Sequence, residues 1–194
     1  MLSLPRMFVV FIAFVTCITA IRAQTPDYKN VGRAPTEAEV KAWDITVGPD
    51  GKGLPPGSGT AKDGAPIFAE KCATCHGQNL EGTQLGPALM GGSGTLTSIQ
   101  PKQTIGSYWP FATTVWDWVN RAMPRGHGQS LSPSEVYSLT AFVLFRNGIV
   151  RESDVMDATT LPKIHMPNRD NFVPANTGEI WEHNKRACHT GTCP

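Results

Sequence analysis

The chain has 194 residues and is nearly neutral, with 17 Lys and Arg against 16 Asp and Glu. Proteins that bind nucleic acid present clustered basic charge, so this balance gives that function no support. The length suits one small domain with extensions.

Residues 1–23 have the layout of a secretory signal peptide. Arg6 gives a basic start, an apolar run extends from Met7 to Ile21, and small residues follow near Ala23. The run is short for a membrane span, so we expect cleavage after Ala23, or as a second choice after Ala20. An uncleaved anchor is the alternative. Cleavage leaves an exported, periplasmic protein with no stable membrane span and with 15 basic against 16 acidic residues.

Residues 24–62 are predicted to form an N-terminal extension. A short helix capped by Thr36 is expected within 35–45. The stretch 46–62 is too rich in Gly and Pro for a helix or a central strand. A solvated linker has little use for large apolar residues, and we expect this segment to pack on a protein surface because it carries Trp43, Ile45 and Leu54.

The first core helix is predicted to be capped by Asp63, with Pro66 in its first turn, and to run into the sequence Cys72-Ala73-Thr74-Cys75-His76. C-x-x-C-H is the attachment motif of a c-type haem. Two thiols on one helical turn can form thioether bonds to the two vinyl groups, and the adjacent His76 is the proximal iron ligand. We therefore predict one covalently bound haem c.

Two other kinds of site also use a C-x-x-C pair. A structural zinc site needs two more ligands at matching spacing, and the chain has no second C-x-x-C motif or His pair. A thioredoxin-like motif follows a strand, and no strand-like run precedes Cys72. Both alternatives are weaker than haem attachment.

The Gly-rich stretch after the motif, residues 77–94, is predicted to be a loop. A phosphate-binding loop is the alternative, but the pattern G-x-x-x-x-G-K-[ST] does not occur in it. A loop of this composition lets the backbone wrap closely around one edge of a haem.

Residues 107–123 predict a second core helix, capped by Thr113 or Thr114. Trp116 and Met123 lie beside an apolar stripe at helical spacing, formed by Val115, Trp118, Val119 and Ala122. We expect most of these side chains to belong to a core that includes the porphyrin.

The last core helix has the clearest signals. Ser132 is its cap, Pro133 occupies the first helical position, and Glu135 completes a capping box. The second half of the helix is almost entirely apolar, which predicts deep packing, and Asn147-Gly148 ends it. The remaining residues, 149–194, are rich in Pro and polar side chains, and we expect them to lie over the surface as extended chain.

An electron-transfer haem usually has a second axial ligand, and a Met thioether there raises the reduction potential. The mature chain offers Met90, Met123, Met156 and Met166. Met90 is too near His76 in sequence to reach the opposite haem face easily. Met123 precedes Pro124 at the end of a helix, so the chain can travel around the haem and present this sulfur. His127 is the second candidate, and core packing is the alternative use of a methionine.

The two C-terminal cysteines, Cys188 and Cys193, are not needed for haem attachment. Because the haem takes Cys72 and Cys75, the exported chain keeps one further pair in an oxidising compartment. We expect a disulfide between them.

Together these motifs resemble the class I cytochromes c. The likeness rests on C-A-T-C-H at 72–76, Gly86-Pro87, Arg121-Ala122-Met123-Pro124 and the final helix from Leu131. Within that class, the chain is similar to the cytochrome c subunits of sulfite dehydrogenases and of the Sox sulfur-oxidation system. This narrower likeness covers about residues 34–173, and its blocks are 42–59, 107–124, 146–150 and 157–172.

The resemblance implies an all-α, class I cytochrome c fold, with three to five helices around one covalently bound haem and extended N- and C-terminal segments. It implies thioether bonds at Cys72 and Cys75. It also implies that His76 and Met123 are the axial iron ligands.

Three further residues have implied roles next to the haem. The carbonyl of Pro87 would accept a hydrogen bond from the His76 ring and so fix the orientation of the ligand. Tyr108 and Trp109 would lie near the haem propionates.

The predicted domain organisation follows from these assignments. A signal peptide at 1–23 precedes the N-terminal extension at 24–62. The cytochrome c domain occupies 63–150, and an extended tail occupies 151–194.

The resemblance also implies a function: a subunit that transfers single electrons and performs no bond chemistry of its own. Its partner would be a molybdenum-cofactor dehydrogenase that oxidises sulfite or bound sulfane sulfur, and a downstream cytochrome c or oxidase would receive the electrons. A free-standing electron carrier is the alternative, and a haem sensor that binds gas at an open iron site is a third hypothesis. Extensions at both ends favour the subunit, because a carrier needs only the haem domain.

The chain departs from Sox-type proteins that carry a second haem domain. It has one C-x-x-C-H motif, and no His follows Cys193 in the C-terminal sequence C-H-T-G-T-C-P. We therefore expect a monohaem subunit.

Overall fold

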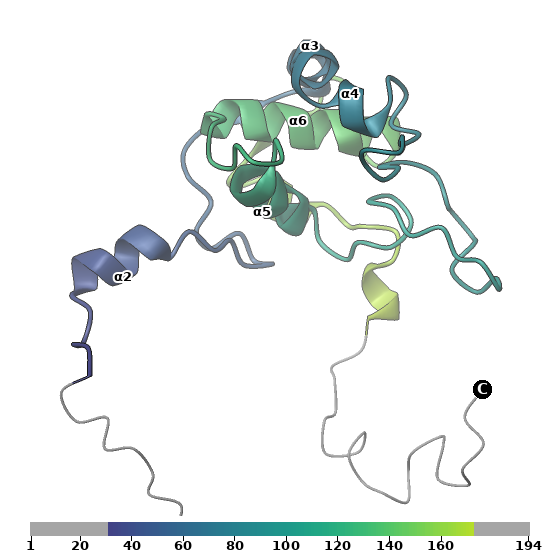
Figure 1. The fold of residues 1–194 in the computed structure, drawn as a ribbon. Coiled ribbons are helices and arrows are strands. Elements are labelled where there is room, and N and C mark those ends of the chain that lie inside the picture. Colours follow the sequence, from purple (N-terminus) through teal and green to yellow (C-terminus); the bar gives the residue numbers. More distant parts are fainter. Residues whose placement is uncertain (1–30, 173–194) are drawn as a thin grey trace, which may run out of the picture. The chain divides into compact units, whose positions relative to one another are not determined.

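The computed structural model describes residues 31–172 (Figure 1). The predicted signal peptide at 1–23 and the predicted Cys188–Cys193 disulfide lie outside the described residues. The chain divides into two units, Met1–Trp43 and Asp44–Pro194. Within 31–172, no helix is both long and apolar enough to cross a membrane.

The first unit contains the short helix α2 (Glu37–Trp43), as predicted. The Thr36 hydroxyl accepts the Glu39 N–H at 3.3 Å, and the Glu39 carboxylate accepts the Thr36 N–H at 2.8 Å. Arg33 pairs with the same carboxylate, and this pair, with the Thr36 bonds, lowers the pKa of Glu39 to about 2. Local contacts therefore stabilise the start of α2.

Helix α3 (Ala61–Lys71) begins earlier than the sequence predicts. Its cap is Thr60, whose hydroxyl accepts the Asp63 N–H at 3.3 Å, while the Asp63 carboxylate accepts the Thr60 N–H at 3.1 Å. The prediction of Asp63 as the cap is wrong, because this reciprocal capping box uses Asp63 inside the helix. Pro66 accordingly lies in the helix interior and not in the first turn.

Helix α6 (Pro133–Arg146) has the start and the end that the sequence predicts. The Ser132 hydroxyl accepts the Glu135 N–H at 3.3 Å, and the Glu135 carboxylate accepts the Ser132 N–H at 2.8 Å. Gly148 follows with a φ of +71°, a conformation that suits glycine. Every residue from Val136 to Leu144 is buried, which confirms the predicted deep packing.

Helices α3 and α6 cross in close contact. At Gly64 a Cβ atom would overlap the backbone carbonyl of Ser138. The rings of Phe68 and Phe142 pack on the same two helices with their centroids 5.2 Å apart. The glycine therefore permits the approach that fixes α3, and with it the C-x-x-C-H motif, against α6.

Helix α5 (Ala112–Ala122) is preceded by Phe111 and has no side-chain cap. The predicted caps, Thr113 and Thr114, are wrong because both residues lie inside the helix. The Thr113 hydroxyl instead donates to the Pro49 carbonyl at 3.5 Å. The Thr113 hydroxyl, which the local sequence predicted to cap the helix, therefore bonds to a distant segment of the chain.

The buried face of α5 also differs from the predicted one. Trp116 is 1% exposed and packs on Tyr137 of α6 with the ring centroids 5.4 Å apart, whereas Trp118 is 52% exposed. Asp117 is buried because its carboxylate accepts the Val47 N–H at 3.1 Å. The N-terminal extension covers this side of the helix, so helical periodicity alone predicts the wrong stripe.

Residues 44–57, which we call the strap, pack on the core of the second unit. Three hydrogen bonds attach the strap. Two are those already described with Asp117 and Thr113, and in the third the Tyr137 hydroxyl donates to the Pro55 carbonyl at 2.9 Å. The strap leads into β1 (Ser58–Gly59), which pairs antiparallel with β2 (Met156–Asp157). The strap thus covers the domain's own core.

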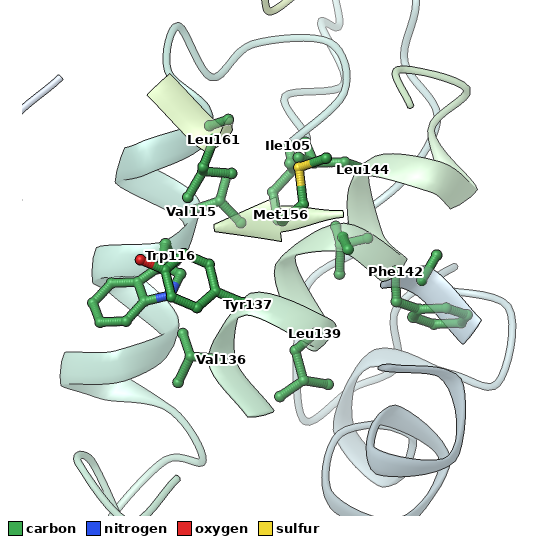
Figure 2. Close-up of a cluster of buried hydrophobic side chains, with 14 of the residues drawn as sticks. Ile105, Val115, Trp116, Val136, Tyr137, Leu139, Phe142, Leu144, Met156 and Leu161 are labelled. Carbon is green, nitrogen blue, oxygen red and sulfur yellow. The ribbon is translucent and has the colours of Figure 1, made fainter. Parts of the chain in front are cut away.

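Residues 149–172 contribute to the core and do not only lie over the surface, which corrects the prediction for this part of the tail. Met156, Leu161 and Met166 are at most 2% exposed. Figure 2 shows Met156 and Leu161 in one cluster with side chains from α5 and α6. The segment also contains two short 3₁₀ helices, η1 (Leu161–Lys163) and η2 (Arg169–Asn171).

Candidate functional site

The C-x-x-C-H motif occupies a single tight turn at the end of α3. The helix breaks at Cys72, where φ is −124° and ψ is −34°, and α4 (Ala73–His76) follows. The Cys72 carbonyl accepts both the Cys75 N–H at 3.1 Å and the His76 N–H at 3.0 Å. Two thiols and an imidazole are therefore carried by one short stretch of helical backbone.

The two thiols, Cys72 and Cys75, are half-buried and do not form a disulfide. Burial, with a smaller contribution from Cys75, raises the pKa of the Cys72 thiol to about 11. Dithiol redox motifs use a thiolate whose pKa is lowered, so the raised pKa of Cys72 argues against that use. Within 31–172, no group of three or more His, Cys, Asp or Glu side chains is placed to hold a metal ion.

The His76 ring is oriented by the backbone of the following loop. Its Nδ1 lies 2.8 Å from the carbonyl oxygen of Pro87. A carbonyl oxygen can only accept, so the Nδ1 atom carries the proton and donates it. In the neutral imidazole, Nε2 then keeps a free lone pair, which is the atom that an iron ligand needs.

The loop from Gly77 to Leu89 is fastened to this turn by several contacts. The Gly82 N–H donates to the His76 carbonyl at 2.8 Å, and the Thr83 hydroxyl donates to the Cys75 carbonyl at 2.6 Å. Gly86 lies against the same backbone, since a Cβ atom there would be 3.0 Å from the Cys75 oxygen. Gly86-Pro87 therefore supplies both the close approach and the acceptor for His76.

The candidate sulfur ligands differ in how they are used. Met156 and Met166 are buried at 2% and 0% exposure, so their thioethers take part in core packing. Met123 is the residue directly after α5, is half-buried, and donates its N–H to the Val119 carbonyl at 3.1 Å. Met90 is half-buried and packs against the core.

His127, the second candidate ligand, is exposed in a tight turn beyond Met123. Its N–H donates to the Pro124 carbonyl at 2.8 Å, and the Gln129 N–H returns to the Asn120 carbonyl at 2.7 Å. The turn therefore folds back on the end of α5.

Tyr108 and Trp109 each make an aromatic contact with another residue of the domain. Tyr108 is 37% exposed, and its ring meets Phe172 edge-on with the centroids 5.4 Å apart. Its carbonyl accepts the side-chain N–H of Asn168 at 2.9 Å. Trp109 is half-buried and meets Trp118 edge-on at 6.3 Å. Asn168 lies sixty residues further along the chain than Tyr108, so no local pattern signals that contact.

The residues present fit a covalently bound haem. The turn offers two unbonded thiols and an imidazole whose proton is held on Nδ1. Half-buried apolar side chains that pack on the core can cover a porphyrin; among them are Leu89, Met90, Trp109, Val119, Ile149 and Val150.

Comparisons with known proteins agree with this site. The family model for cytochrome c matches residues 61–145. One similar solved structure is a chain of the sulfane dehydrogenase SoxCD from Paracoccus pantotrophus, at 41% sequence identity and a TM-score of 0.72. The likeness covers 85% of this chain and 82% of that chain. No curated protein matches the sequence. The matches confirm the predicted resemblance and, with the mostly helical structure, the predicted fold class.

Proposed function

This chain belongs to the cytochrome c family, and from that premise we propose that it is a periplasmic monohaem electron-transfer subunit. It accepts electrons one at a time from a molybdenum sulfite dehydrogenase-like partner. It passes them to a downstream cytochrome c or oxidase. The cytochrome domain is proposed to occupy 63–150, between an exported N-terminal extension and a C-terminal tail.

The proposed roles follow from what each side chain can hold. Cys72 and Cys75 tether the porphyrin through thioether bonds, and His76 binds the iron through Nε2. Pro87 keeps the His76 ring in one orientation through the 2.8 Å hydrogen bond. Met123 would supply the second protein ligand of the iron. The bound haem provides reversible one-electron exchange at its iron.

The surrounding residues keep water from the haem and leave one edge accessible. Leu89, Val119 and Val150 supply apolar cover, and the tight α3–α6 crossing holds the motif in place. Tyr108 and Trp109 are proposed to lie near the propionates. In this proposal the chain moves electrons and makes or breaks no substrate bond.

The observation that carries the proposal is the imidazole of the C-x-x-C-H turn, bonded through Nδ1 to the Pro87 carbonyl. It leaves Nε2 free on the same turn as two unbonded thiols, an arrangement suited to haem, whereas within 31–172 no three His, Cys, Asp or Glu side chains converge as a zinc site requires. The molybdenum-containing partner is supported by the likeness to a chain of a two-component dehydrogenase. That likeness extends over 85% of the chain, well beyond the cytochrome domain.

Two measurements test the proposal. Intact mass and haem staining of a denaturing gel should show one haem attached to the mature chain, and Cys72→Ser or Cys75→Ser should leave at most one thioether bond. Purification from the native periplasm should yield a complex that contains molybdenum. A mature mass equal to the bare polypeptide would refute haem attachment, and a haem protein that never co-purifies with molybdenum would refute the partner.

A free-standing electron carrier is the second candidate, and one observation favours it. The strap and residues 149–172 bury apolar side chains against the domain's own core, so these side chains are not free for docking. A carrier would exchange electrons with several proteins and would purify as a monomer. The same co-purification experiment separates the two functions.

A further inference from the structure

We propose that Thr83 is a positioning residue for the imidazole of His76 and thereby sets the reduction potential of the haem. The inference deepens the proposed function, because it rests on His76 as the iron ligand. Thr83 does not touch the iron site itself. Its hydroxyl fastens the backbone that carries Pro87 to the backbone that carries His76.

Thr83 makes a hydrogen bond to the C-terminal end of α4. The last carbonyls of a helix have no partner within the helix. The Cys75 carbonyl is one of them, and the Thr83 hydroxyl donates to it at 2.6 Å. The same oxygen atom of Thr83 accepts the Leu85 N–H at 3.0 Å. One side chain therefore joins the motif to the loop and also shapes the loop.

Thr83 also begins the short turn that leads to Pro87. The backbone N–H of Thr83 donates to the Gly86 carbonyl at 2.9 Å, which closes the turn directly before Pro87. Gly86 also lies against Cys75, where a Cβ atom would be 3.0 Å from the carbonyl oxygen. Both ends of the turn are thus held next to the motif, one of them by the Thr83 hydroxyl.

The other contacts that hold this loop are hydrogen bonds between backbone atoms. Gly82 bonds to the His76 carbonyl at 2.8 Å, and Leu89 bonds to the Leu80 carbonyl at 2.9 Å. These backbone bonds survive any side-chain substitution and hold the loop near the motif. The Thr83 hydroxyl adds a bond that a single substitution can remove without changing the backbone, which makes its contribution measurable.

The expected consequence concerns the electron density that the ligand gives to the iron. A hydrogen bond from the far nitrogen of an iron-bound imidazole raises the basicity of the ligand and stabilises the oxidised metal. Loss of the Thr83 bond lets the Pro87 carbonyl move away from Nδ1 and weakens that hydrogen bond. The midpoint potential should therefore rise, and the Nδ1 proton should exchange faster with water.

The experiment uses haem-loaded protein and three variants. Thr83→Val removes the hydroxyl with little change in shape, and Thr83→Ser keeps it. Thr95→Val is the matched control, because the Thr95 hydroxyl also donates to a carbonyl, that of Gly92 at 2.7 Å, and accepts the Lys102 N–H at 3.0 Å. Each protein is measured for midpoint potential, for hydrogen exchange of His76 Nδ1–H by NMR, and for unfolding in urea.

We expect Thr83→Val to have a raised potential and faster Nδ1–H exchange, while Thr83→Ser and Thr95→Val keep wild-type values of both. Thr95→Val should still lose stability, which separates a general structural effect from an effect on His76. A Thr83→Val protein with wild-type potential and exchange overturns the proposal, and so does a Thr95→Val protein with the same shifts.

If the Thr83→Val chain cannot be loaded with haem, a measurement on the wild-type protein still decides the question. A slowly exchanging Thr83 hydroxyl proton supports the bond to Cys75, and a rapidly exchanging one overturns the proposal. Failure of the proposed function looks different. A His76→Ala variant that keeps its low-spin iron spectrum would refute the ligand role of His76, whatever the Thr83 variants do.

Discussion

The backbone N–H of Val47 donates to the carboxylate of Asp117 at 3.1 Å, which bonds the strap to the helix that ends before Met123. A buried carboxylate requires such donors, and Asp117 also pairs with Arg121. The strap is therefore part of the haem domain's own framework. A truncation that extends past residue 43 therefore changes the domain itself as well as any docking surface.

This division of the extension predicts different results for two truncations of the mature chain. Removal of 24–43 should leave the free energy of unfolding unchanged, because no strap bond is lost. Removal of 24–58 deletes the backbone groups that bond to Asp117, Thr113 and Tyr137, together with Ser58 of β1, and should cost at least about 3 kcal/mol at roughly 1 kcal/mol for each bond. Urea unfolding of the two haem-loaded proteins provides the measurement.

The same pair of truncations tests docking by the N-terminal segment. If residues before the strap contact the dehydrogenase-like partner, removal of 24–43 should weaken the complex and leave the haem potential unchanged. Equal stability of the two truncated proteins would contradict the role of the strap. Wild-type affinity after removal of 24–43 would limit docking to the domain surface.

Elements with complete local signals could be predicted from the sequence. The limits of α6 follow from a capping box at one end and Asn147-Gly148 at the other, and the structure contains both features. The C-x-x-C-H turn is likewise local. Where two residues can both cap, as Thr60 and Asp63 can, composition does not say which one lies outside the helix, and the start of α3 was misplaced.

Contacts between distant segments explain the remaining errors. The buried face of α5 depends on the strap, so Asp117 is buried and Trp118 is exposed against the expectation from periodicity. The core role of Met156 and Leu161 arises in a two-residue strand and a three-residue 3₁₀ helix, which are too short to show a period. The same limit hid Thr83, whose hydroxyl is important only because the loop returns to Cys75.

We predict that Met123 is the second axial ligand. Met123→Ala should open the iron, abolish the near-infrared band of Met–Fe(III) ligation and lower the midpoint potential, because a thioether ligand raises it. The near-infrared and visible spectra, together with a redox titration, provide the measurement. If His127 enters the open position, the low-spin spectrum that results should disappear in the Met123→Ala, His127→Ala double variant.

Two other methionines serve as controls for this prediction. Met90→Ala should keep the band, the potential and a closed iron. Met156→Ala should also keep the band but lose about 2–5 kcal/mol of stability, since it empties a buried site. Loss of the band in Met90→Ala and its retention in Met123→Ala would show that the chain takes a different path around the haem.

The raised pKa of Tyr137 predicts that the protein loses stability in alkaline solution. Burial, with a smaller contribution from Asp157, raises the pKa of the Tyr137 hydroxyl to about 12. The unfolded chain releases this proton at about pH 10, whereas the folded protein keeps it, so the contribution to stability is complete below about pH 10 and is lost between about pH 10 and 12. Urea unfolding at a series of pH values should show this fall.

Tyr137→Phe provides the comparison. It deletes the bond to the Pro55 carbonyl and should cost about 1 kcal/mol at pH 8. The deficit should shrink as the pH rises above 10, because phenylalanine has no proton to release. A deficit that stays constant up to pH 11.5 would rule out the raised pKa as the cause.

The last prediction concerns the surface through which electrons enter. Thr74 is an exposed residue of α4, between the two cysteines that are proposed to tether the haem. Electron tunnelling weakens steeply with distance, so a partner must approach an exposed haem edge, and we expect that edge to lie on the thioether side. A carboxylate at position 74 would have to lose its water on docking. Thr74→Glu should therefore slow reduction by the partner, on the order of tenfold for a penalty of ~1.4 kcal/mol.

The haem spectrum and the midpoint potential of Thr74→Glu should stay as in the wild type, because the side chain points away from the buried core. Gln100→Glu, which adds the same charge at another exposed position, is the control and should be reduced at the wild-type rate. Stopped-flow mixing with the reduced dehydrogenase gives both rates. If Thr74→Glu also accepts electrons at the wild-type rate and still co-purifies with the partner, the thioether edge is not the docking surface.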